Sequence, residues 1–332
     1  MTPLGRGRAA PTFGLVLTAL LVVYVVWGST YLAIRIVVEE APPLTSMGLR
    51  YLTAAVLLAA ILSLRGGLRR LRLTGRQALG TAFLGLMLPM LGNGMVAVGE
   101  NLGAPSGVAA LLVAVAPLII VLLRVVDGDR PGPLTVLGVL LGFAGLGYLV
   151  LAGRGSVDHL PVIPSLIVLL ASTCWAFGSY VQPRLWLPDD VFVTTVYEML
   201  FGGLILSAVG TMAGEHFTFD YPARTWIALG YLILFGSVLA FTAYVWLIAN
   251  APISFVATYA YVNPVVAVFL GWLVLAEPLT VPVLVGGGIV VLAVAVVISA
   301  ERPRRRRVPE VAVAGEPGPL VEVHAAAPAD RD

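Results

Sequence analysis

The sequence predicts an all-α integral membrane protein with ten transmembrane helices in two inverted five-helix repeats. Three observations predict this class. Of the 332 residues, 59% are hydrophobic and only 11% are charged, the charges bound long apolar segments, and the second half repeats the first. A soluble domain has about 25% charged residues, so this chain could not cover a water-exposed surface. The composition excludes a soluble enzyme, a disordered protein and a free nucleic-acid-binding protein.

Uncharged segments define the helices. A membrane-crossing helix needs about 20 residues at 1.5 Å rise each. Six uncharged segments have 23 or 24 residues: Thr12–Ile34, Gln77–Gly99, Asn101–Leu123, Pro131–Gly153, Leu160–Pro183 and Pro278–Ala300. The 52 uncharged residues of Thr225–Ala276 predict two spans with a turn at Asn250-Ala251-Pro252. Two more apolar segments contain one charge each: Leu44–Leu64 with Arg50, and Val191–Ala213 with Glu198.

Arginine placement predicts the orientation. All 20 basic residues are Arg, and a ten-helix topology puts 15 of them on one side: Arg6, Arg8, Arg65, Arg69, Arg70, Arg72, Arg76, Arg124, Arg130, Arg184, Arg302, Arg304, Arg305, Arg306 and Arg307. The other side has Arg35, Arg154 and Arg224. Because cytoplasmic loops are rich in Arg and Lys, both termini are expected in the cytoplasm. Residues 1–14 form a short arm, and the Arg-rich tail 301–332 is expected to be disordered.

An internal repeat relates the two halves of the chain. Trp27 matches Trp175 and Arg50 matches Glu198, both at an offset of 148 residues. The offset predicts one repeat over 15–153 and another over 163–300. Each repeat has an odd number of helices, so the second must cross the membrane in the opposite sense. Inverted repeats are typical of secondary transporters, whose binding site lies between the halves near the bilayer midplane.

Several short motifs occur in the same order and spacing as in a known family. They are Trp27-Gly28-Ser29-Thr30-Tyr31, Pro42-Pro43, Leu49-Arg50-Tyr51, Gly92-Asn93-Gly94-Met95, Trp175-Ala176-Phe177-Gly178-Ser179, Glu198-Met199, Tyr259-Ala260-Tyr261-Val262-Asn263-Pro264 and Glu277-Pro278-Leu279. Over residues 15 to 300 the chain resembles the EamA-type drug/metabolite transporters, and their YedA-like bacterial branch in particular. The resemblance implies ten helices, a central cavity between pseudo-symmetric halves, and export of small metabolites or drugs. One departure is Gly128-Asp129-Arg130, where the family usually has Gly-Glu-Arg.

Arg50 and Glu198 are the charged residues inside the predicted spans. An ionised side chain at a helix centre costs roughly 2.5–3.5 kcal/mol on insertion scales, so each should face protein or water. One hypothesis is that Arg50 attracts an anionic group and Glu198 a cation or a proton. The alternative is that each ties its helix to neighbouring groups. Hydroxyl residues on the same helix faces are expected to satisfy both charges: Ser46 and Thr53 for Arg50, Thr194 and Thr195 for Glu198.

Aromatic and helix-bending residues are further candidates for the cavity. Trp27 with Tyr31, and Trp175 with Ser179, occupy matching helix faces and predict either an aromatic cavity wall or simple helix packing. Pro264 removes the hydrogen bond to the Ala260 carbonyl and predicts a kinked helix. The polar residues around that kink either line the cavity or only accompany a packing bend: Tyr259, Tyr261 and Asn263. Pro117 predicts a second kink.

Other polar and small residues have simpler expectations. Asn93, between two glycines, either faces the cavity or forms a hydrogen bond between helices. Glu100 and Asn101 are expected to be solvated at the mouth of a loop. Five glycines predict close helix packing: Gly138, Gly142, Gly286, Gly287 and Gly288.

The absence of several sequence motifs excludes several classes of function. One Cys excludes a disulfide framework or a multi-cysteine metal site, and no nucleotide loop or zinc-protease motif is present. We therefore expect no cofactor, no metal and no enzyme activity. The prediction is a secondary transporter that exports small, amino-acid-like metabolites or drugs across the inner membrane by alternating access, coupled to protons or by exchange. A non-transporting receptor or scaffold, and an intramembrane enzyme, are the alternatives; homodimer formation stays open.

Overall fold

Apolar helices account for almost all of the ordered chain in the computed structural model, which describes residues 12–152, 161–251, 256 and 259–300 and shows no strand among them. The described residues belong to one compact unit. Some sequence predictions fall on other residues: the arm up to residue 11, Arg154, the turn residue Pro252, and the tail after Ala300 lie outside the described residues.

The first half of the chain contains five predicted spans. Its helices are α1 (Phe13–Val38), α2 (Pro43–Gly66), α3 (Gly75–Gly85), η2 (Leu86–Gly94), α4 (Met95–Asn101), α5 (Ser106–Val113), α6 (Ala116–Val126) and α7 (Pro133–Ala152), with a 3-10 turn, η1, at Leu68–Leu71. The consecutive helices α3, η2 and α4 form one span, and so do α5 and α6.

The second half repeats this plan. Its helices are α8 (Val162–Val181), α9 (Val191–Met212), α10 (Ala223–Tyr231), η5 (Leu232–Leu239), α11 (Ala240–Asn250), α13 (Tyr259–Leu275) and α14 (Val281–Ala300), with a 3-10 turn, η4, at Gln182–Arg184. Within the described ranges, eight helices are long and apolar enough to cross a membrane, and two apolar helices are shorter, Pro133–Leu149 and Tyr259–Leu275. Together they match the predicted ten spans.

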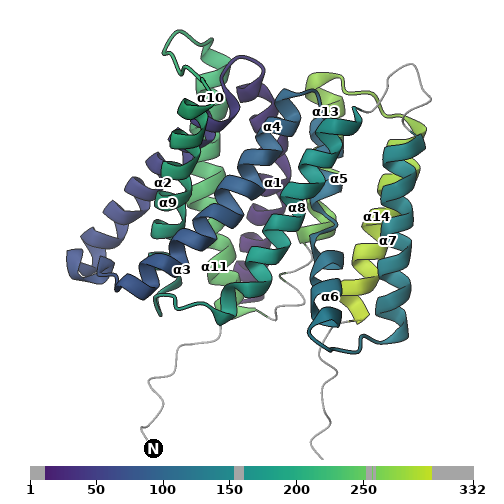
Figure 1. Ribbon diagram of the computed structural model, residues 1–332, viewed down its shortest axis with the longest axis horizontal. Helices are drawn as coiled ribbons and strands as arrows, with labels where there is room; N and C mark the ends of the chain where they lie inside the picture. Colours follow the sequence, from purple (N-terminus) through teal and green to yellow (C-terminus); the bar gives the residue numbers. More distant parts are fainter. Residues whose placement is uncertain (1–11, 153–160, 252–255, 257–258, 301–332) are drawn as a thin grey trace, which may run out of the picture. The chain divides into compact units, whose positions relative to one another are not determined.

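The helices pair in a pattern that the inverted repeat requires. In Figure 1, α2 lies beside α9 at one side and α7 lies beside α14 at the other. Each of these pairs joins equivalent spans of the two halves, the second and the fifth of each. Between them, α1 packs on α13, and its counterpart α8 packs on α5 and α6. The two-repeat fold predicted from the offset of 148 residues is confirmed.

Glycines allow the closest of these helix contacts. A Cβ added to Gly203 of α9 would lie 2.9 Å from the Leu52 nitrogen and 3.1 Å from the Gly48 carbonyl oxygen, both in α2. At the other pair, a Cβ on Gly286 of α14 would lie 3.0 Å from the backbone of Leu149 in α7. Small residues at membrane helix contacts let backbones approach, as the glycines of the second pair predicted.

Two spans contain a π-helical stretch at equivalent places. η2 lies in the third span of the first half and η5 in the third span of the second half. The sequence analysis did not predict these stretches, although both contain glycine and η2 contains Pro89, which cannot donate a backbone hydrogen bond. Single π-helical turns are rare in proteins, and those that occur are often found at functional sites.

Proline shapes the fourth span of each half differently. α5 ends at Val113 and α6 begins at Ala116, so the span is broken just before Pro117. In the second half, α13 runs from Tyr259 through Pro264 without an interruption. Pro117 therefore accompanies a break in its span. Pro264 removes one backbone hydrogen bond but does not interrupt α13.

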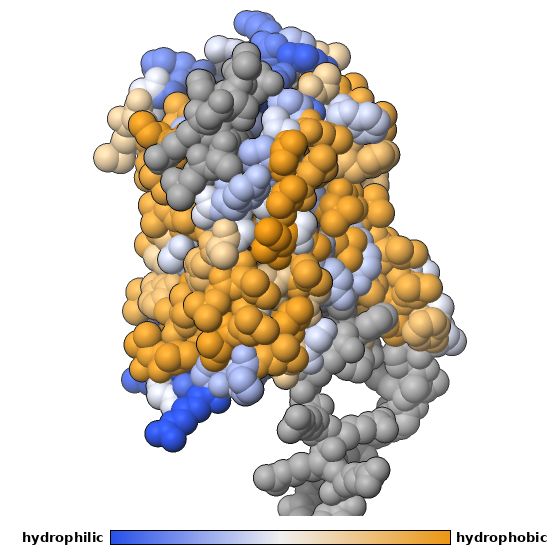
Figure 2. Space-filling view, turned by 90° about the vertical axis from the view of Figure 1, so that its right-hand side faces the viewer, coloured by the Kyte–Doolittle hydropathy of each residue, from blue (hydrophilic) through white to orange (hydrophobic). Residues whose placement is uncertain are grey.

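The two ends of the helix bundle differ in charge. Figure 2 shows a broad hydrophobic band between two hydrophilic ends. The end at which α1 finishes, called here the acidic end, carries six described acids and two arginines: Glu39, Glu40, Glu100, Glu215, Asp220, Glu277, Arg35 and Arg224. The opposite end, called the basic end, carries eight described arginines and four acids: Arg65, Arg69, Arg70, Arg72, Arg76, Arg124, Arg130, Arg184, Asp127, Asp129, Asp189 and Asp190.

Two carboxylates at the acidic end cap helices from the other half. Glu215, which follows α9, accepts hydrogen bonds from the Leu44 and Thr45 nitrogens at 3.1 and 2.7 Å. Glu277, which follows α13, accepts from the Ser106 nitrogen at 2.7 Å and the Gly107 nitrogen at 3.1 Å. A carboxylate there satisfies free backbone donors and complements the helix dipole. These bonds join the two halves at this end.

The departure from the family pattern at residue 129 lies at the basic end. Gly128 has a positive φ of 90°, and Asp129 accepts hydrogen bonds from the Arg124 guanidinium at 2.8 Å and from the Arg130 backbone at 2.8 Å. The Arg124 guanidinium holds the pKa of Asp129 below its ordinary value. The shorter acid therefore joins the turn after α6 to the Arg124 side chain.

The contact between α2 and α9 is testable with an added methyl group. We expect Gly203→Ala to lower the free energy of unfolding by about 1–3 kcal/mol, because the new Cβ meets backbone that cannot yield. Gly288→Ala is the control, since a Cβ there meets nothing within 4 Å. Thermal unfolding in detergent measures both variants. Equal midpoints for Gly203→Ala and the control would contradict the described packing.

Candidate functional site

Trp27 in α1 lies in an aromatic cluster contributed by both halves. Its indole Nε1 donates to the Gly236 carbonyl at 3.2 Å. Its ring centroid lies 4.9 Å from that of Tyr244 and 5.3 Å from that of Tyr259, the second pair edge to face. Among the predicted cavity residues, the structure thus brings Trp27 and Tyr259 together, with Tyr244 as an unpredicted third member.

Arg50 is buried, with 4% of its surface exposed, and is held from another helix. Its Nε donates to the Ser237 hydroxyl at 3.0 Å, and its Cζ lies 4.8 Å from the ring centroid of Tyr51. The expectation that hydroxyls of its own helix satisfy it is wrong: Ser46 Oγ is buried without a hydrogen bond, and none is described from Thr53. The reason is that the long side chain reaches across to η5.

Trp27 and Arg50 are anchored on consecutive residues of η5. Trp27 bonds to Gly236 and Arg50 to Ser237. A Cβ on Gly236 would lie 3.1 Å from Thr30 Cγ2 and 3.4 Å from Arg50 Nη2. Only glycine fits between these side chains without displacing them. The π-helical stretch therefore joins the aromatic cluster to the buried cation.

Glu198 in α9 has 7% of its surface exposed and makes no hydrogen bond or ion pair to any described residue. Thr194 and Thr195 were expected to satisfy it, but their hydroxyls donate to backbone carbonyls instead, so this expectation is wrong. Threonine in a helix commonly bonds to its own backbone. Glu198 does interact electrostatically with Tyr51, the neighbour of Arg50, and with Tyr244 of the aromatic cluster, and its helix α9 contacts both α2 and α11.

Arg50 and Glu198 hold equivalent places. Each is the eighth residue of its helix, so each lies about 10 Å from the helix start. No ion pair joins them in the described coordinates. The two helices start at opposite ends, so the two charges approach the middle of the bundle from opposite sides. The arrangement offers a fixed cation and an unpaired carboxyl group in the same bundle as the aromatic cluster.

The second tryptophan has a different setting. A Cβ on Gly92 of η2 would lie 2.8 Å from Trp175 Cε3, so the Trp175 ring packs directly on η2 next to Asn93. The Asn93 side chain is half-buried and has no hydrogen bond to a described residue. Ser179, one turn further along α8, likewise has none. Trp175, Asn93 and Ser179 therefore share a region that no described contact joins to the Trp27 cluster.

The remaining predicted residues divide between cluster and core. Tyr31 packs against the hydrophobic core around α5 and α14, and it interacts electrostatically with Glu100 and with Tyr259. Asn263 is buried, and its amide nitrogen, in the orientation its surroundings favour, donates to the carbonyls of Tyr24 at 3.2 Å and Tyr259 at 3.3 Å. It therefore ties α13 to α1. Tyr261 packs against the hydrophobic core around α5 and α14.

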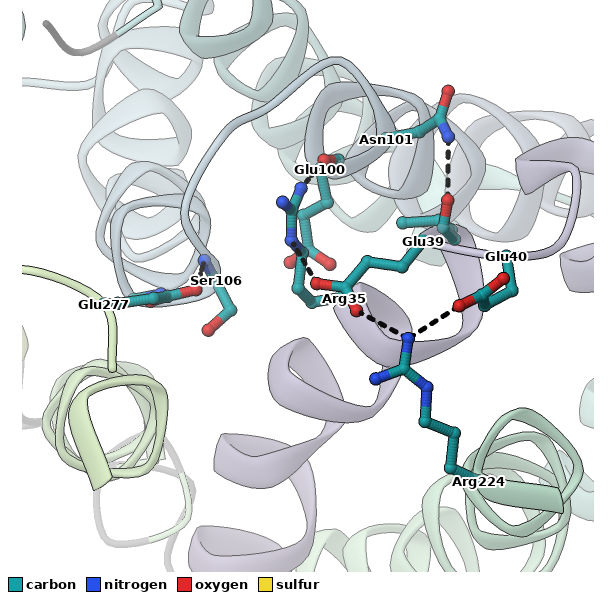
Figure 3. A network of polar contacts seen from close by, with 10 residues as sticks. Arg35, Glu39, Glu40, Glu100, Asn101, Ser106, Arg224 and Glu277 are labelled. Carbon is teal, nitrogen blue, oxygen red and sulfur yellow. Dashed lines mark hydrogen bonds and ion pairs between the residues drawn. The ribbon is translucent and has the colours of Figure 1, made fainter. Parts of the chain in front are cut away.

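The environment of Glu100 differs from the one that the sequence predicts. This residue was expected to be solvated at a loop, yet it is fully buried and neither carboxyl oxygen has a hydrogen bond. Figure 3 shows the Arg35 guanidinium donating to the backbone carbonyl of Glu100 and pairing with Glu39. The neighbouring Asn101 is exposed and donates to the Val38 carbonyl at 2.8 Å. The loop closes over Glu100 because α4 ends against α1.

A pocket of about 220 Å³ lies at the acidic end, away from the aromatic cluster. Its wall comes from the start of α5 and the turn between α13 and α14, and it includes Glu277, Gly107 and Pro278. It touches none of Trp27, Arg50, Trp175 and Glu198.

Sequence reasoning missed the residues that η5 and α11 contribute. Ser237 and Tyr244 are seven residues apart, so they share one helix face, and Phe241 lies between them on that face. A polar and aromatic stripe inside an uncharged span was a usable signal.

The helices, their inverted pairing and the buried polar cluster at the middle define a polytopic membrane protein with the architecture of a secondary transporter. Comparison with known proteins specifies this further. The sequence profile of the EamA-like transporter family matches residues 13–151 and 162–299. The chain belongs to the EamA-like transporter family.

Relatives agree with this assignment. The chain is 40% identical over 288 residues to "Uncharacterized inner membrane transporter YedA" of Escherichia coli K12, covering 86% of this chain and 90% of that protein. It is 25% identical to "Uncharacterized transporter YvbV" of Bacillus subtilis, covering 87% and 93%. A crystal structure with 21% identity superposes with a TM-score of 0.60 and covers 87% of this chain and 97% of the other, which shows the shared fold.

The bond between Arg50 and Ser237 can be tested by its removal. We expect Ser237→Ala to lower the free energy of unfolding by about 1.5–3 kcal/mol, because the buried guanidinium loses its hydroxyl acceptor. Thr173→Ala is the control, since the exposed Thr173 hydroxyl bonds only to its own helix. Chemical unfolding in detergent compares them. A Ser237→Ala variant as stable as the control would show that Arg50 does not depend on this contact.

Proposed function

We propose that this transporter exports small, amino-acid-like metabolites or amphipathic drugs across the inner membrane by alternating access. The observation that carries this proposal is the cluster at the middle of the bundle, where Trp27, Arg50 and Glu198 come from both halves. A cation, a carboxyl and aromatic rings suit a molecule with a charged group and an apolar body.

Three further features support the proposal. The relative YedA is named an inner membrane transporter. The basic end, with eight described arginines, fits the cytoplasmic side, so both termini are assigned to the cytoplasm. An intramembrane ionisable residue without a structural partner, as Glu198 is, marks a functional site by default.

The remaining candidate residues enter the proposal as parts of two access routes. Trp175, Ser179 and Asn93 correspond to the Trp27 region under the repeat, so they are assigned to the opposite access route. On the Trp27 side, Tyr259 completes the wall and Asn263 holds α13 against α1. Tyr31 and Tyr261 support this wall from the neighbouring core. The receptor, scaffold and enzyme alternatives lack a comparable feature in the described part of the chain.

Transport itself is tested by a tolerance and efflux screen in cells that overexpress the protein. The panel contains amino acids and amphipathic dyes, and the control is the Arg50→Ala/Glu198→Ala double variant at equal membrane abundance. Lower accumulation of a panel member with the wild-type chain, but not with the double variant, supports export. Equal accumulation of every panel member with both chains contradicts it.

Proton coupling is tested separately in inverted vesicles with a panel member that passes the screen. We expect Glu198→Gln to reduce uptake driven by a pH gradient to the level without a gradient, because the amide cannot exchange a proton. Counterflow exchange at equal pH reports whether the variant still binds and moves the substrate. Unchanged dependence on the pH gradient would remove Glu198 as the proton carrier.

A further inference from the structure

Glu100 is a second buried acid that the proposed transport site does not use. It is the penultimate residue of α4, none of its surface is exposed, and both of its carboxyl oxygens lack a hydrogen bond. The hydroxyl of Ser106, at the start of α5 nearby, is buried without a partner as well. Buried polar groups are nearly always hydrogen-bonded, so the unpartnered Glu100 carboxyl group is an exception that requires a proton or a cation to neutralise it.

The nearest cation does not neutralise Glu100. Arg35 in α1 donates to the backbone carbonyl of Glu100 rather than to its carboxyl group. Arg35 Nε lies 3.4 Å from a Glu39 oxygen. Glu39 in turn pairs with Arg224 at 3.4 Å. Figure 3 shows this chain of ion pairs running from α1 to α10 and leaving the Glu100 carboxyl outside it.

No described group around Glu100 donates a hydrogen bond to its carboxyl oxygens. Glu277 and Arg35 both interact electrostatically with Glu100, the first by repulsion, and Tyr31 faces it from α1. The Glu277 carboxylate is already committed to the start of α5. The described helices α8, η2 and α5 contain no charged residue. The charged residues of α2, Arg50 and Arg65, lie about two and about six turns from the start of that helix.

We propose that Glu100 is a proton-binding site at the acidic end. Its proton keeps the Arg35–Glu39 and Glu39–Arg224 ion pairs formed. An isolated carboxylate in an apolar interior costs several kcal/mol, and the neutral acid avoids this cost. A metal ion is disfavoured as the occupant, because no three acidic, His or Cys side chains gather as a metal site in the described residues.

Loss of the proton changes which partner Arg35 takes. The carboxylate then carries a negative charge that only Arg35 can reach, so the guanidinium leaves Glu39 for Glu100. Glu39 then loses the Arg35 contact that orients its side chain toward Arg224. The connection between α1 and α10 becomes less well ordered as a result. The proton leaves or arrives through the nearby pocket, whose wall includes Glu277. This site is distinct from Glu198 and does not depend on the substrate.

Infrared spectroscopy of the full chain in lipid nanodiscs tests the proton directly. The C=O stretch of a protonated carboxyl group is resolved from carboxylate bands. We expect the wild-type minus Glu100→Gln difference spectrum at neutral pH to contain this band. The wild-type minus Glu40→Gln spectrum, the control from the same end, should contain carboxylate bands only. Absence of the protonated band from the Glu100 difference, or its loss when Na⁺ replaces a bulky organic cation, overturns the proposal.

Thiol labelling tests whether the proton on Glu100 controls the exposure of buried residues at the acidic end. In a Cys174→Ser background, Ser106→Cys is a buried reporter, and Leu102→Cys, at a position that is 52% exposed, normalises the pH dependence of the reagent. We expect the ratio of the Ser106→Cys rate to the Leu102→Cys rate to rise several-fold between about pH 6 and about pH 9. With Glu100→Gln added, the ratio should stay low throughout. A ratio that rises equally with Glu100→Gln contradicts control by Glu100.

Discussion

The cost of placing a charged group in hydrocarbon is the constraint on which the rest of this structure depends. It confines almost all charged side chains to the acidic and basic ends and leaves Arg50 and Glu198 between them. Arg50 persists inside because Ser237 supplies an acceptor and Tyr51 an aromatic face. Glu198 persists without a described partner, and the same is true of Glu100. The exceptions to the constraint are therefore the places where function is most readily sought.

The inverted repeat places equivalent polar features in both halves of the helix bundle. Equivalent helices carry Arg50 and Glu198 toward the middle from opposite sides, and both third spans contain a π-helical stretch. The symmetry is incomplete: Glu215 and Glu277 tie the halves together at the acidic end through helix caps. Such bonds must be exchanged or carried along if the two halves are to rock against each other.

The sequence predicted the fold well because its signals were local. A charge-free segment or a proline such as Pro117 acts within one span. The offset of 148 residues relates equivalent positions of the two repeats. The site was harder, because its contacts join distant residues: Arg50 with Ser237, and Ser106 with Glu277. Periodicity tells which face of a helix is polar, but it does not tell which helix covers that face. Glu100 was misread for this reason, since its burial is produced by α1.

The central claim is that the Trp27–Arg50–Glu198 cluster is a substrate site reached alternately from each side. Impermeant thiol labelling of Thr30→Cys in a Cys174→Ser background tests it most directly, since Thr30 lies between Trp27 and Arg50. The control is Leu170→Cys, on the apolar outer surface. The account predicts labelling of Thr30→Cys from both sides of the membrane, slowed by a transported panel member, and none of Leu170→Cys. Labelling from neither side, or labelling that no panel member slows, would contradict it.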